Sequence, residues 1–256
     1  MGAKRRTKNS YSVLILKNRI LAHYLKRYQN EIGVSVNGKM KKIVIWGASG
    51  HAKVVADILR LNGEYQIEGF LDNVNKGLKG TKFYGAKILG GEELLQELLE
   101  HDVSNIIMGF GNCERRLLLT LKVRKMGFNL ISAVHPNSVI SSDVIIKSGT
   151  VIAAGAVINP CSIIGENVII NTSASVDHDC QIGDGVHICP GVHLAGKVHI
   201  GRASWIGIGS CVRDNISIGE YSKIGAGSVV VKNIPAGVIA FGNPAIIFKK
   251  NDYNDD

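Results

Sequence analysis

The sequence predicts an α/β domain followed by an all-β domain, and three features of the chain support this. Branched aliphatic residues recur at every sixth position across residues 134–235. Strand and helix patterns alternate across residues 41–133. Residues 1–42 hold eleven Lys or Arg against the single Glu31, so the remaining chain is close to neutral. A length of 256 residues fits two domains.

The six-residue repeat sets the architecture of the second domain. Its leading positions are Val134, Ile140, Ile146, Ile152, Ile158, Ile164, Ile170, Val176, Ile182, Ile188, Leu194, Ile200, Ile206, Val212, Ile218, Ile224 and Val230. Such a period fits neither an α-helix nor a plain strand and is typical of a parallel β-helix. We expect each unit to form a short strand and a turn, three units to close one triangular coil, and the leading aliphatics to stack inside. Residues 236–256 are expected to form a C-terminal tail.

Residues 1–40 form a basic N-terminal extension. Apolar residues between Val13 and Leu25 are spaced approximately as on a helix face and are flanked by Lys and Arg. One interpretation is a helix that contacts a membrane surface. We favour a loosely ordered extension ahead of a start at Met40. Because the excess charge lies in this extension, the folded body is not expected to bind nucleic acid.

The α/β pattern of residues 41–133 indicates a Rossmann-like domain. A buried strand over 42–46 leads into the turn Gly47-Ala48-Ser49-Gly50-His51, a helix over 52–61 and a strand over 67–71. This order corresponds to half of a nucleotide-binding unit, although a tight turn packing a helix on a strand is the simpler alternative. The remaining expected elements are a helix over 92–99, a strand over 105–108, a helix over 115–125 and a strand over 128–133.

The cysteines and the hydropathy bear on the cellular setting. The five Cys residues contain no CxxC pair, and no secretory leader precedes them, which favours a reduced, cytoplasmic protein. No apolar run approaches the length needed to span a membrane.

Several motifs resemble one family of hexapeptide-repeat acyltransferases. They are Trp46-Gly47-Ala48-Ser49-Gly50-His51, Phe70-Leu71-Asp72, Leu89-Gly90-Gly91, Gly111-Asn112, Val134-His135-Pro136 and the uninterrupted repeat with Asn171 and His178. Over residues 41 to about 248 the chain resembles the subfamily of nucleotide-sugar N-acetyltransferases and sialic acid O-acetyltransferases. The resemblance implies a left-handed β-helix that binds acetyl-CoA, a nucleotide-sugar in the α/β domain, and a homotrimer with active sites between neighbouring chains.

The resemblance also implies roles for individual residues. His178 would be the catalytic base and Asp179 its partner, although related enzymes often carry Glu at that position. The substrate site would be formed by Ser49, Gly50, His51, Asp72, Asn73, Gly111 and Asn171. At position 73 relatives often have a second acidic residue. Acetyl-CoA would contact His187, Gly196, Ile208 and Ala226.

The histidines decide between acyl transfer and a metal site. Transfer from a thioester to an amine needs a base, and an imidazole is largely neutral yet basic at pH 7. Some other left-handed β-helix enzymes bind zinc through imidazoles. However, His187, His193 and His199 are six residues apart, so each should face a different side of the prism, whereas zinc needs about four convergent ligands. Two chains could still pool ligands, but the sequence shows no convergent set, so we expect no metal.

The sequence is compatible with three functions. The first is an N-acetyltransferase that moves acetyl from acetyl-CoA to the amino group of a nucleotide-linked amino sugar, for surface glycan biosynthesis. The second is an O-acetyltransferase acting on sialic acid or a similar hydroxyl. The third is a non-catalytic β-helix scaffold, in which the polar residues around His178 would be accidental.

Overall fold

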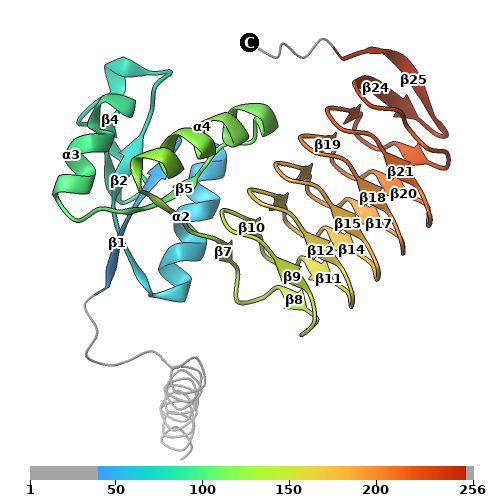
Figure 1. The fold of residues 1–256 in the computed structure, drawn as a ribbon, viewed down its shortest axis with the longest axis horizontal. Helices are drawn as coiled ribbons and strands as arrows, with labels where there is room; N and C mark the ends of the chain where they lie inside the picture. The colour runs from blue at the N-terminus through green and yellow to red at the C-terminus, as the bar shows by residue number, and fades with distance from the viewer. Residues whose placement is uncertain (1–39, 252–256) are drawn as a thin grey trace, which may run out of the picture. The chain divides into compact units, whose positions relative to one another are not determined.

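The α/β domain and the β-helix follow one another along the chain (Figure 1). The structure is a computed structural model that describes residues 40–251. Residues 1–39 of the predicted basic extension, which was expected over 1–40, lie outside the described residues. Within the described range no helix is both long enough and apolar enough to cross a membrane.

The α/β domain contains a six-stranded sheet with the order β3-β4-β2-β1-β5-β6. Its strands are β1 (Lys41–Trp46), β2 (Tyr65–Leu71), β3 (Lys82–Phe83), β4 (Ala86–Gly90), β5 (Asn105–Met108) and β6 (Asn129–Leu130). The central strand β1 pairs in parallel with β2 and β5. Its last four residues are buried, as expected of a parallel strand covered on both faces.

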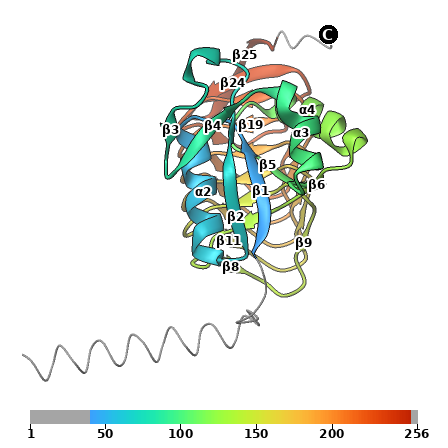
Figure 2. The same cartoon turned by 90° about the vertical axis from the view of Figure 1, so that its left-hand side faces the viewer.

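Helices cover both faces of this sheet, with α2 on one side and α3 and α4 on the other (Figure 2). Their bounds are α2 (Gly50–Asn62), α3 (Leu95–Glu100) and α4 (Cys113–Met126), with short 3₁₀ turns η1 (Lys76–Leu78) and η2 (Glu92–Leu94). The side chain of Asn112 accepts a 2.8 Å hydrogen bond from the backbone of Arg115 and caps the start of α4. Gly63 and Gly127 end α2 and α4 in the left-handed conformation.

The repeat forms seventeen two-residue strands, and each predicted leading aliphatic is the second residue of one of them. They are β7 (Ala133–Val134), β8 (Val139–Ile140), β9 (Ile145–Ile146), β10 (Val151–Ile152), β11 (Val157–Ile158), β12 (Ile163–Ile164), β13 (Ile169–Ile170), β14 (Ser175–Val176), β15 (Gln181–Ile182), β16 (His187–Ile188), β17 (His193–Leu194), β18 (His199–Ile200), β19 (Trp205–Ile206), β20 (Cys211–Val212), β21 (Ser217–Ile218), β22 (Lys223–Ile224) and β23 (Val229–Val230).

These strands form the three faces of a left-handed parallel β-helix, which confirms the predicted fold. Face A contains β7, β10, β13, β16, β19 and β22; face B contains β8, β11, β14, β17, β20 and β23; face C contains β9, β12, β15, β18 and β21. Each strand pairs with the strand one coil later, as Val151 does with Ile169. Burying each large aliphatic of the stacked core contributes roughly 1.5–3 kcal/mol.

Buried hydroxyl groups hold the corners of successive coils together. Ser162, for example, donates a 2.8 Å hydrogen bond to the carbonyl of Asp177 and accepts one from the backbone of Cys180. Thr150, Ser204 and Ser210 make the equivalent pairs of bonds. The small polar residues of the repeat therefore satisfy backbone groups that the turns would otherwise leave unpaired inside the core.

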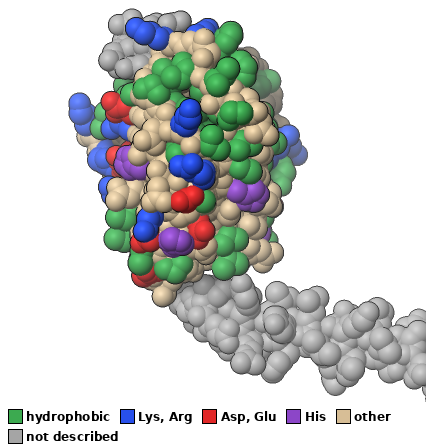
Figure 3. Space-filling view, turned by 90° about the vertical axis from the view of Figure 1, so that its right-hand side faces the viewer, with side chains coloured by type: hydrophobic (Ala, Val, Ile, Leu, Met, Phe, Trp, Pro, Cys, Tyr) green, Lys and Arg blue, Asp and Glu red, His purple; other side chains and the backbone are tan. Residues whose placement is uncertain are grey.

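Two predicted boundaries need correction. The strand expected over 128–133 is divided, because β6 pairs with β5 of the α/β sheet whereas β7 is the first rung of face A. The expected tail contains two further strands, β24 (Val238–Gly242) and β25 (Ala245–Lys250), which extend face A. Exposed hydrophobic side chains gather over this end of the β-helix (Figure 3), and on the hairpin they are Phe241, Ile246, Ile247 and Phe248.

The α/β domain covers the first coils of face A. Val151 and Ile169, whose side chains point outward from face A, are buried in one cluster with residues of α2. The corresponding aliphatics on the other two faces, Val139 on face B and Ile145 on face C, are exposed. Faces B and C therefore remain open in a single copy of the chain.

Candidate active site

A cleft of about 320 Å³ lies at the carboxyl ends of the central parallel strands. Its lining comes from the turns after β1, β2 and β5: Trp46, Gly47, Ala48, Ser49, Leu71, Asp72, Asn73, Val74, Asn75, Phe110, Asn112, Arg115 and Leu119. Ligands of open α/β sheets bind at this edge. Three of the sequence-predicted substrate residues, Ser49, Asp72 and Asn73, line the cleft.

Asp72 shapes the loop that forms one wall. Its carboxylate accepts hydrogen bonds from the backbone of Val74 (2.7 Å) and from both the backbone and the side chain of Asn75 (3.1 Å each). Burial by itself would raise the pKa of Asp72, but the hydrogen bonds from Asn75 and Val74 and the charge of Arg115 lower it overall. Asn73 accepts a 3.0 Å bond from the backbone of Glu92 and ties the loop to η2.

The turn between β1 and α2 forms the opposite wall. Gly47 has φ +126°, and a Cβ at this position would lie 2.8 Å from the carbonyl oxygen of Gly109, so the turn requires glycine here. Ser49 precedes α2 without making a side-chain capping bond, which leaves its hydroxyl available. A Cβ at Gly50 would meet no atom of the chain within 4 Å.

Phe110, Asn112 and Arg115 are among the lining residues that the sequence did not assign to the substrate site. Gly111 was predicted instead, because the Gly-Asn motif marked the turn after β5. The helix predicted to start at residue 115 placed Arg115 at a helix N-terminus, and this position is the sequence feature that could have identified Arg115 as a cleft residue.

A neighbouring hollow of about 650 Å³ shares Asp72, Asn73 and Asn75 and is also lined by Lys79, Glu92 and Lys122. Lys122 and Glu92 form a 2.6 Å ion pair there.

The structure places His51 against the β-helix instead of in the cleft lining. Its ring lies 6.2 Å from that of His187, which points outward from face A and is itself edge-on to Trp205. The Nε2 atom of His187 lies 3.1 Å from the side-chain amide nitrogen of Asn171. A Cβ on Gly111 would be 3.5 Å from the His187 ring. His51, Gly111, Asn171 and His187 therefore form one group, which we term the two-histidine cluster.

Both imidazoles of the two-histidine cluster are neutral at physiological pH. Burial, followed by the charge of Arg116, lowers the pKa of His51 to about 4. Burial, the same arginine and then His51 lower the pKa of His187 to about 3. Within residues 40–251, the buried Nε2 atom of His51 has no hydrogen-bond partner, and the buried Nδ1 atom of His187 has none apart from a contact with the backbone of Gly111. Buried polar atoms without a full set of partners are rare in folded proteins, which marks the two-histidine cluster as a candidate functional group.

Arg116 connects the cleft with the β-helix. It is almost completely buried, and its guanidinium donates to five backbone carbonyls. These are Phe110 (3.3 Å), Gly111 (2.7 Å), Asn167 (3.3 Å), Gly185 (2.7 Å) and Val186 (3.4 Å). A planar group with five donors can satisfy several carbonyls at once. Arg116 thereby ties the turn after β5 to the coil corner that precedes His187.

His178 and Asp179 form a pair on the edge between faces B and C. The Nδ1 atom of His178 lies 2.7 Å from a carboxylate oxygen of Asp179, and both side chains are about half exposed. This contact leaves Nε2 free to exchange a proton with a substrate. Asp179 adopts φ +60°, one of a column of left-handed residues at this corner.

Gly196, one coil later, makes room for the imidazole of His178. A Cβ on Gly196 would lie 2.6 Å from both Cε1 and Nε2 of the ring. The backbone amide of Lys197 donates a 2.9 Å hydrogen bond to the carbonyl of His178. Sequence reasoning placed Gly196 in the acetyl-CoA site, and the structure brings it directly beside His178.

The remaining predicted residues lie on another edge of the prism. Ile208 and Ala226 are stacked in neighbouring coils between faces A and B, where the amide of Gly227 donates to the carbonyl of Ile208. Asn171 lies on this same edge. The edge between faces B and C, which carries His178 and Gly196, is opposite face A in a triangular coil. A single chain therefore does not bring His178 together with the two-histidine cluster or the cleft.

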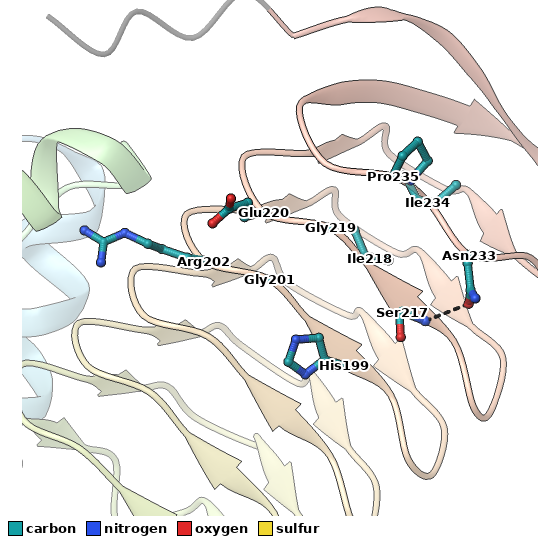
Figure 4. A pocket seen from close by; sticks show the side chains of 10 residues that line it. All are labelled: His199, Gly201, Arg202, Ser217, Ile218, Gly219, Glu220, Asn233, Ile234 and Pro235. Carbon is teal, nitrogen blue, oxygen red and sulfur yellow. Dashed lines mark hydrogen bonds between the residues drawn. The ribbon is translucent and has the colours of Figure 1, made fainter.

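Two other parts of the molecule carry polar side chains that a site could use, the histidines of the repeat and a groove on the β-helix. His187, His193 and His199 lie in β16, β17 and β18, on three different faces, and within residues 40–251 no group of three His, Cys, Asp or Glu side chains could hold a metal ion. An open groove of about 560 Å³ lies near the end of face C (Figure 4), with Arg202 and Glu220 on one side and His199 and Ser217 on the other. It contains none of the predicted site residues.

Two family models match the chain. The PglD N-terminal domain matches residues 42–123, and the bacterial transferase hexapeptide model (six repeats) matches residues 161–196 and 197–232. The first match ends inside α4 and contains the whole cleft lining. The second contains His178, His187 and Gly196. A comparison with curated protein sequences gave no match.

Several solved structures share both domains. PerB from Caulobacter crescentus, solved with CoA and GDP-perosamine, is 37% identical, with 84% of this chain and 98% of that chain covered and a TM-score of 0.77. The acetyltransferase domain of PglB from Neisseria gonorrhoeae, solved with acetyl coenzyme A, is 37% identical, with coverage of 82% and 100% and a TM-score of 0.77. WeeI from Acinetobacter baumannii is 29% identical, with coverage of 80% and 99% and a TM-score of 0.73.

Proposed function

Because this chain belongs to the PglD-like hexapeptide-repeat acetyltransferases, we propose that it transfers the acetyl group of acetyl-CoA to the amino group of a nucleotide-linked amino sugar. The observation that carries the proposal is the His178–Asp179 pair, which lies next to Gly196 on an open edge of the β-helix. A scaffold without catalytic function does not account for an imidazole held in this way beside a glycine.

The cleft of the α/β domain is the proposed nucleotide-sugar site. The free amides at the start of α2, the available hydroxyl of Ser49 and the exposed guanidinium of Arg115 suit a diphosphate. Asp72, held as a carboxylate, and Asn73 suit the hydroxyl groups of a ribose or sugar. Gly50, with open space beside its Cα, allows a phosphate to approach the backbone.

His178 is the proposed general base. Its Nε2 takes a proton from the sugar amine as the nitrogen forms a bond with the acetyl carbon. The carbon–sulfur bond then breaks, and the proton passes to the departing sulfur of coenzyme A. Asp179, hydrogen-bonded to Nδ1, keeps the correct tautomer and stabilises the imidazolium. The backbone amide of Gly196 lies at the same corner and is our candidate donor to the thioester oxygen.

The acetyl-CoA site is proposed to lie between two copies of the chain. His178 and Gly196 occupy the edge between faces B and C, whereas His187, Ile208 and Ala226 are on face A or its edge with face B. One copy therefore supplies the base, and its neighbour supplies the two-histidine cluster and the cleft. Threefold repetition of this contact gives a homotrimer. The exposed aliphatics Val139, Ile145 and Ile163 on faces B and C suit burial in such an interface.

The substrate class can be tested by mass spectrometry. The full chain would be incubated with acetyl-CoA and a panel of nucleotide-linked amino sugars, including GDP-perosamine, together with sialic acids. We expect one acetyl group on an amine of a nucleotide-sugar. Acetylation of sialic acid alone would assign the chain to O-acetyl transfer. Absence of any acetylated product with this panel would refute the proposed function.

A further inference from the structure

The residue before His178 holds the backbone of the proposed base. The Oδ1 atom of Asp177 accepts a 2.8 Å hydrogen bond from the backbone amide of His178. The same oxygen accepts a 2.7 Å bond from the side-chain amide of Asn159, 18 residues earlier in the chain and one coil below. Asn159, Asp177 and His178 therefore form a chain of contacts that ends on the main chain of the base.

We propose that Asp177 and Asn159 are positioning residues for acetyl transfer, which fix the main chain of His178 while Asp179 fixes its ring. This inference rests on the proposed function, because it takes His178 to be the base. The two carboxylates act at different points: Asp179 contacts Nδ1 of the imidazole, and Asp177 contacts the peptide nitrogen. The resemblance to known acetyltransferases did not assign a role to Asp177 or Asn159.

A purely structural role in the turn does not account for these contacts. The same corner recurs one coil later, where Ala195 takes the place of Asp177 and Gly196 that of His178. Left-handed residues occupy the next position in both coils, with φ +60° at Asp179 and +59° at Lys197. Because this turn forms with alanine at its first position, it does not need a carboxylate there. The Asp177 bonds are specific to the coil that carries the imidazole.

The other polar groups around His178 are fixed as well. Its carbonyl accepts a 2.9 Å bond from the amide of Lys197, and the amide of Asp179 donates a 3.0 Å bond to the carbonyl of Pro160. The bond from Asn159, followed by the bond from the His178 backbone, lowers the pKa of Asp177, so this acceptor is a carboxylate at neutral pH. Asp177 completes the set, since among residues 40–251 it is the one acceptor for the His178 amide.

The test compares Asp177→Ala, Asp177→Asn and Asn159→Ala by steady-state kinetics with acetyl-CoA and GDP-perosamine, or whichever panel member has the highest kcat/KM. Asp177→Ala should lower kcat by about 10- to 100-fold, because displacement of a catalytic group by about 1 Å has effects of this order. KM for both substrates should stay within about twofold. Asp177→Asn keeps an oxygen acceptor and should recover most of kcat. Asn159→Ala should also lower kcat, by a smaller factor than Asp177→Ala.

Ser141→Ala is the matched control, because Ser141 occupies the same corner position two coils below Asp177 and should leave kcat unchanged. His178→Ala, measured in parallel, separates this inference from the proposed function. A strong loss in His178→Ala with near-normal kcat in Asp177→Ala would overturn the positioning role. So would an Asp177→Asn variant as impaired as Asp177→Ala, because the charge and not the backbone bond would then be responsible. A His178→Ala variant of normal activity would instead refute the proposed base.

Discussion

Arg116 of α4 donates a 2.7 Å hydrogen bond to the carbonyl oxygen of Gly185 in the β-helix. Its Nη1 atom donates to the carbonyls of Phe110 and Gly111 in the turn after β5, so one buried side chain joins the wall of the proposed nucleotide cleft to the corner that precedes His187. Burial, followed by the charge of this guanidinium, lowers the pKa of both His51 and His187.

Replacing this guanidinium should destabilise the protein. Arg116→Lys retains the charge but cannot reach five carbonyls, so several buried acceptors lose their partners. We expect the free energy of unfolding to fall by about 2–4 kcal/mol. Denaturant unfolding measures this change. Arg115→Lys, at the exposed neighbouring position, is the control and should stay within about 0.5 kcal/mol of wild type. Equal effects of the two substitutions would contradict the structural role of Arg116.

The buried imidazole of His187 should make stability depend on pH. Its folded pKa of about 3 lies below the unfolded value of 6.5, so between these values the unfolded chain binds the additional proton. Above pH 6.5 this histidine therefore does not lower the free energy of unfolding. As the pH falls from 6.5 towards 3, protonation of the unfolded chain lowers the free energy of unfolding progressively. His187→Gln, which does not titrate, should reduce the slope of unfolding free energy against pH by up to about 1.4 kcal/mol per unit. A wild-type slope in His187→Gln would contradict the assignment.

Removing the proposed base should affect turnover and little else. His178 is exposed and is not part of the aliphatic core, so His178→Ala should keep the fold and the affinity for acetyl-CoA. We expect kcat to fall by roughly 10²- to 10⁴-fold. Asp179→Asn should be less harmful, because the base itself remains. Folded His178→Ala protein with kcat within a few-fold of wild type would redirect the search to His187.

Gly196 offers a steric test of the same site. An alanine there would place its Cβ 2.6 Å from Nε2 of His178 and push the ring aside without disturbing the core. We expect Gly196→Ala to lower kcat by about 10²-fold, with little change in melting temperature. Gly77→Ala, at a glycine whose added Cβ meets nothing within 4 Å, serves as the control. Wild-type kcat in Gly196→Ala would show that the ring position is not critical.

The two glycines of the β1–α2 turn should respond differently to substitution. Gly50→Val projects into open space and should raise the apparent KM for the nucleotide-sugar much more than that for acetyl-CoA, because it blocks the approach of a phosphate. Gly47→Ala requires a strained backbone and a close contact with Gly109, so it should lower the melting temperature instead. An equal rise in both KM values for Gly50→Val would indicate that this glycine is only structural.

Much of the fold was predictable, because the signals were periodic and local. Each leading aliphatic from Val134 to Val230 ends a strand of the β-helix, since a side chain at every sixth position must point inward for the coils to close. The two strands near the end of the chain could not be predicted in this way. The run from Val238 to Lys250 has no six-residue period, and it forms strands because β24 pairs with the exposed edge of β22.

The candidate site was predictable only in its motifs. Ser49, Asp72 and Asn73 follow strand ends, and their position at the edge of a parallel sheet follows from that order. His51 belongs to the same turn but faces His187, because its position at the start of α2 directs it towards face A. Nothing in the sequence indicated that Arg116 is buried, because an arginine within an α-helix is usually solvated. The packing of α4 on the β-helix buries it.

The sequence by itself determined the coil, the alternation of strands and helices in the α/β domain and the types of residue at the site, because each depends on spacing along the chain. Only the tertiary structure decided which of these residues meet. Winding the chain into three faces puts His178 and His187, nine residues apart, on opposite sides of the prism, and it brings Asn159 within 2.7 Å of Asp177. The physical reason is that 18 residues complete one coil, so distance in space follows the angle around the prism and not separation in sequence.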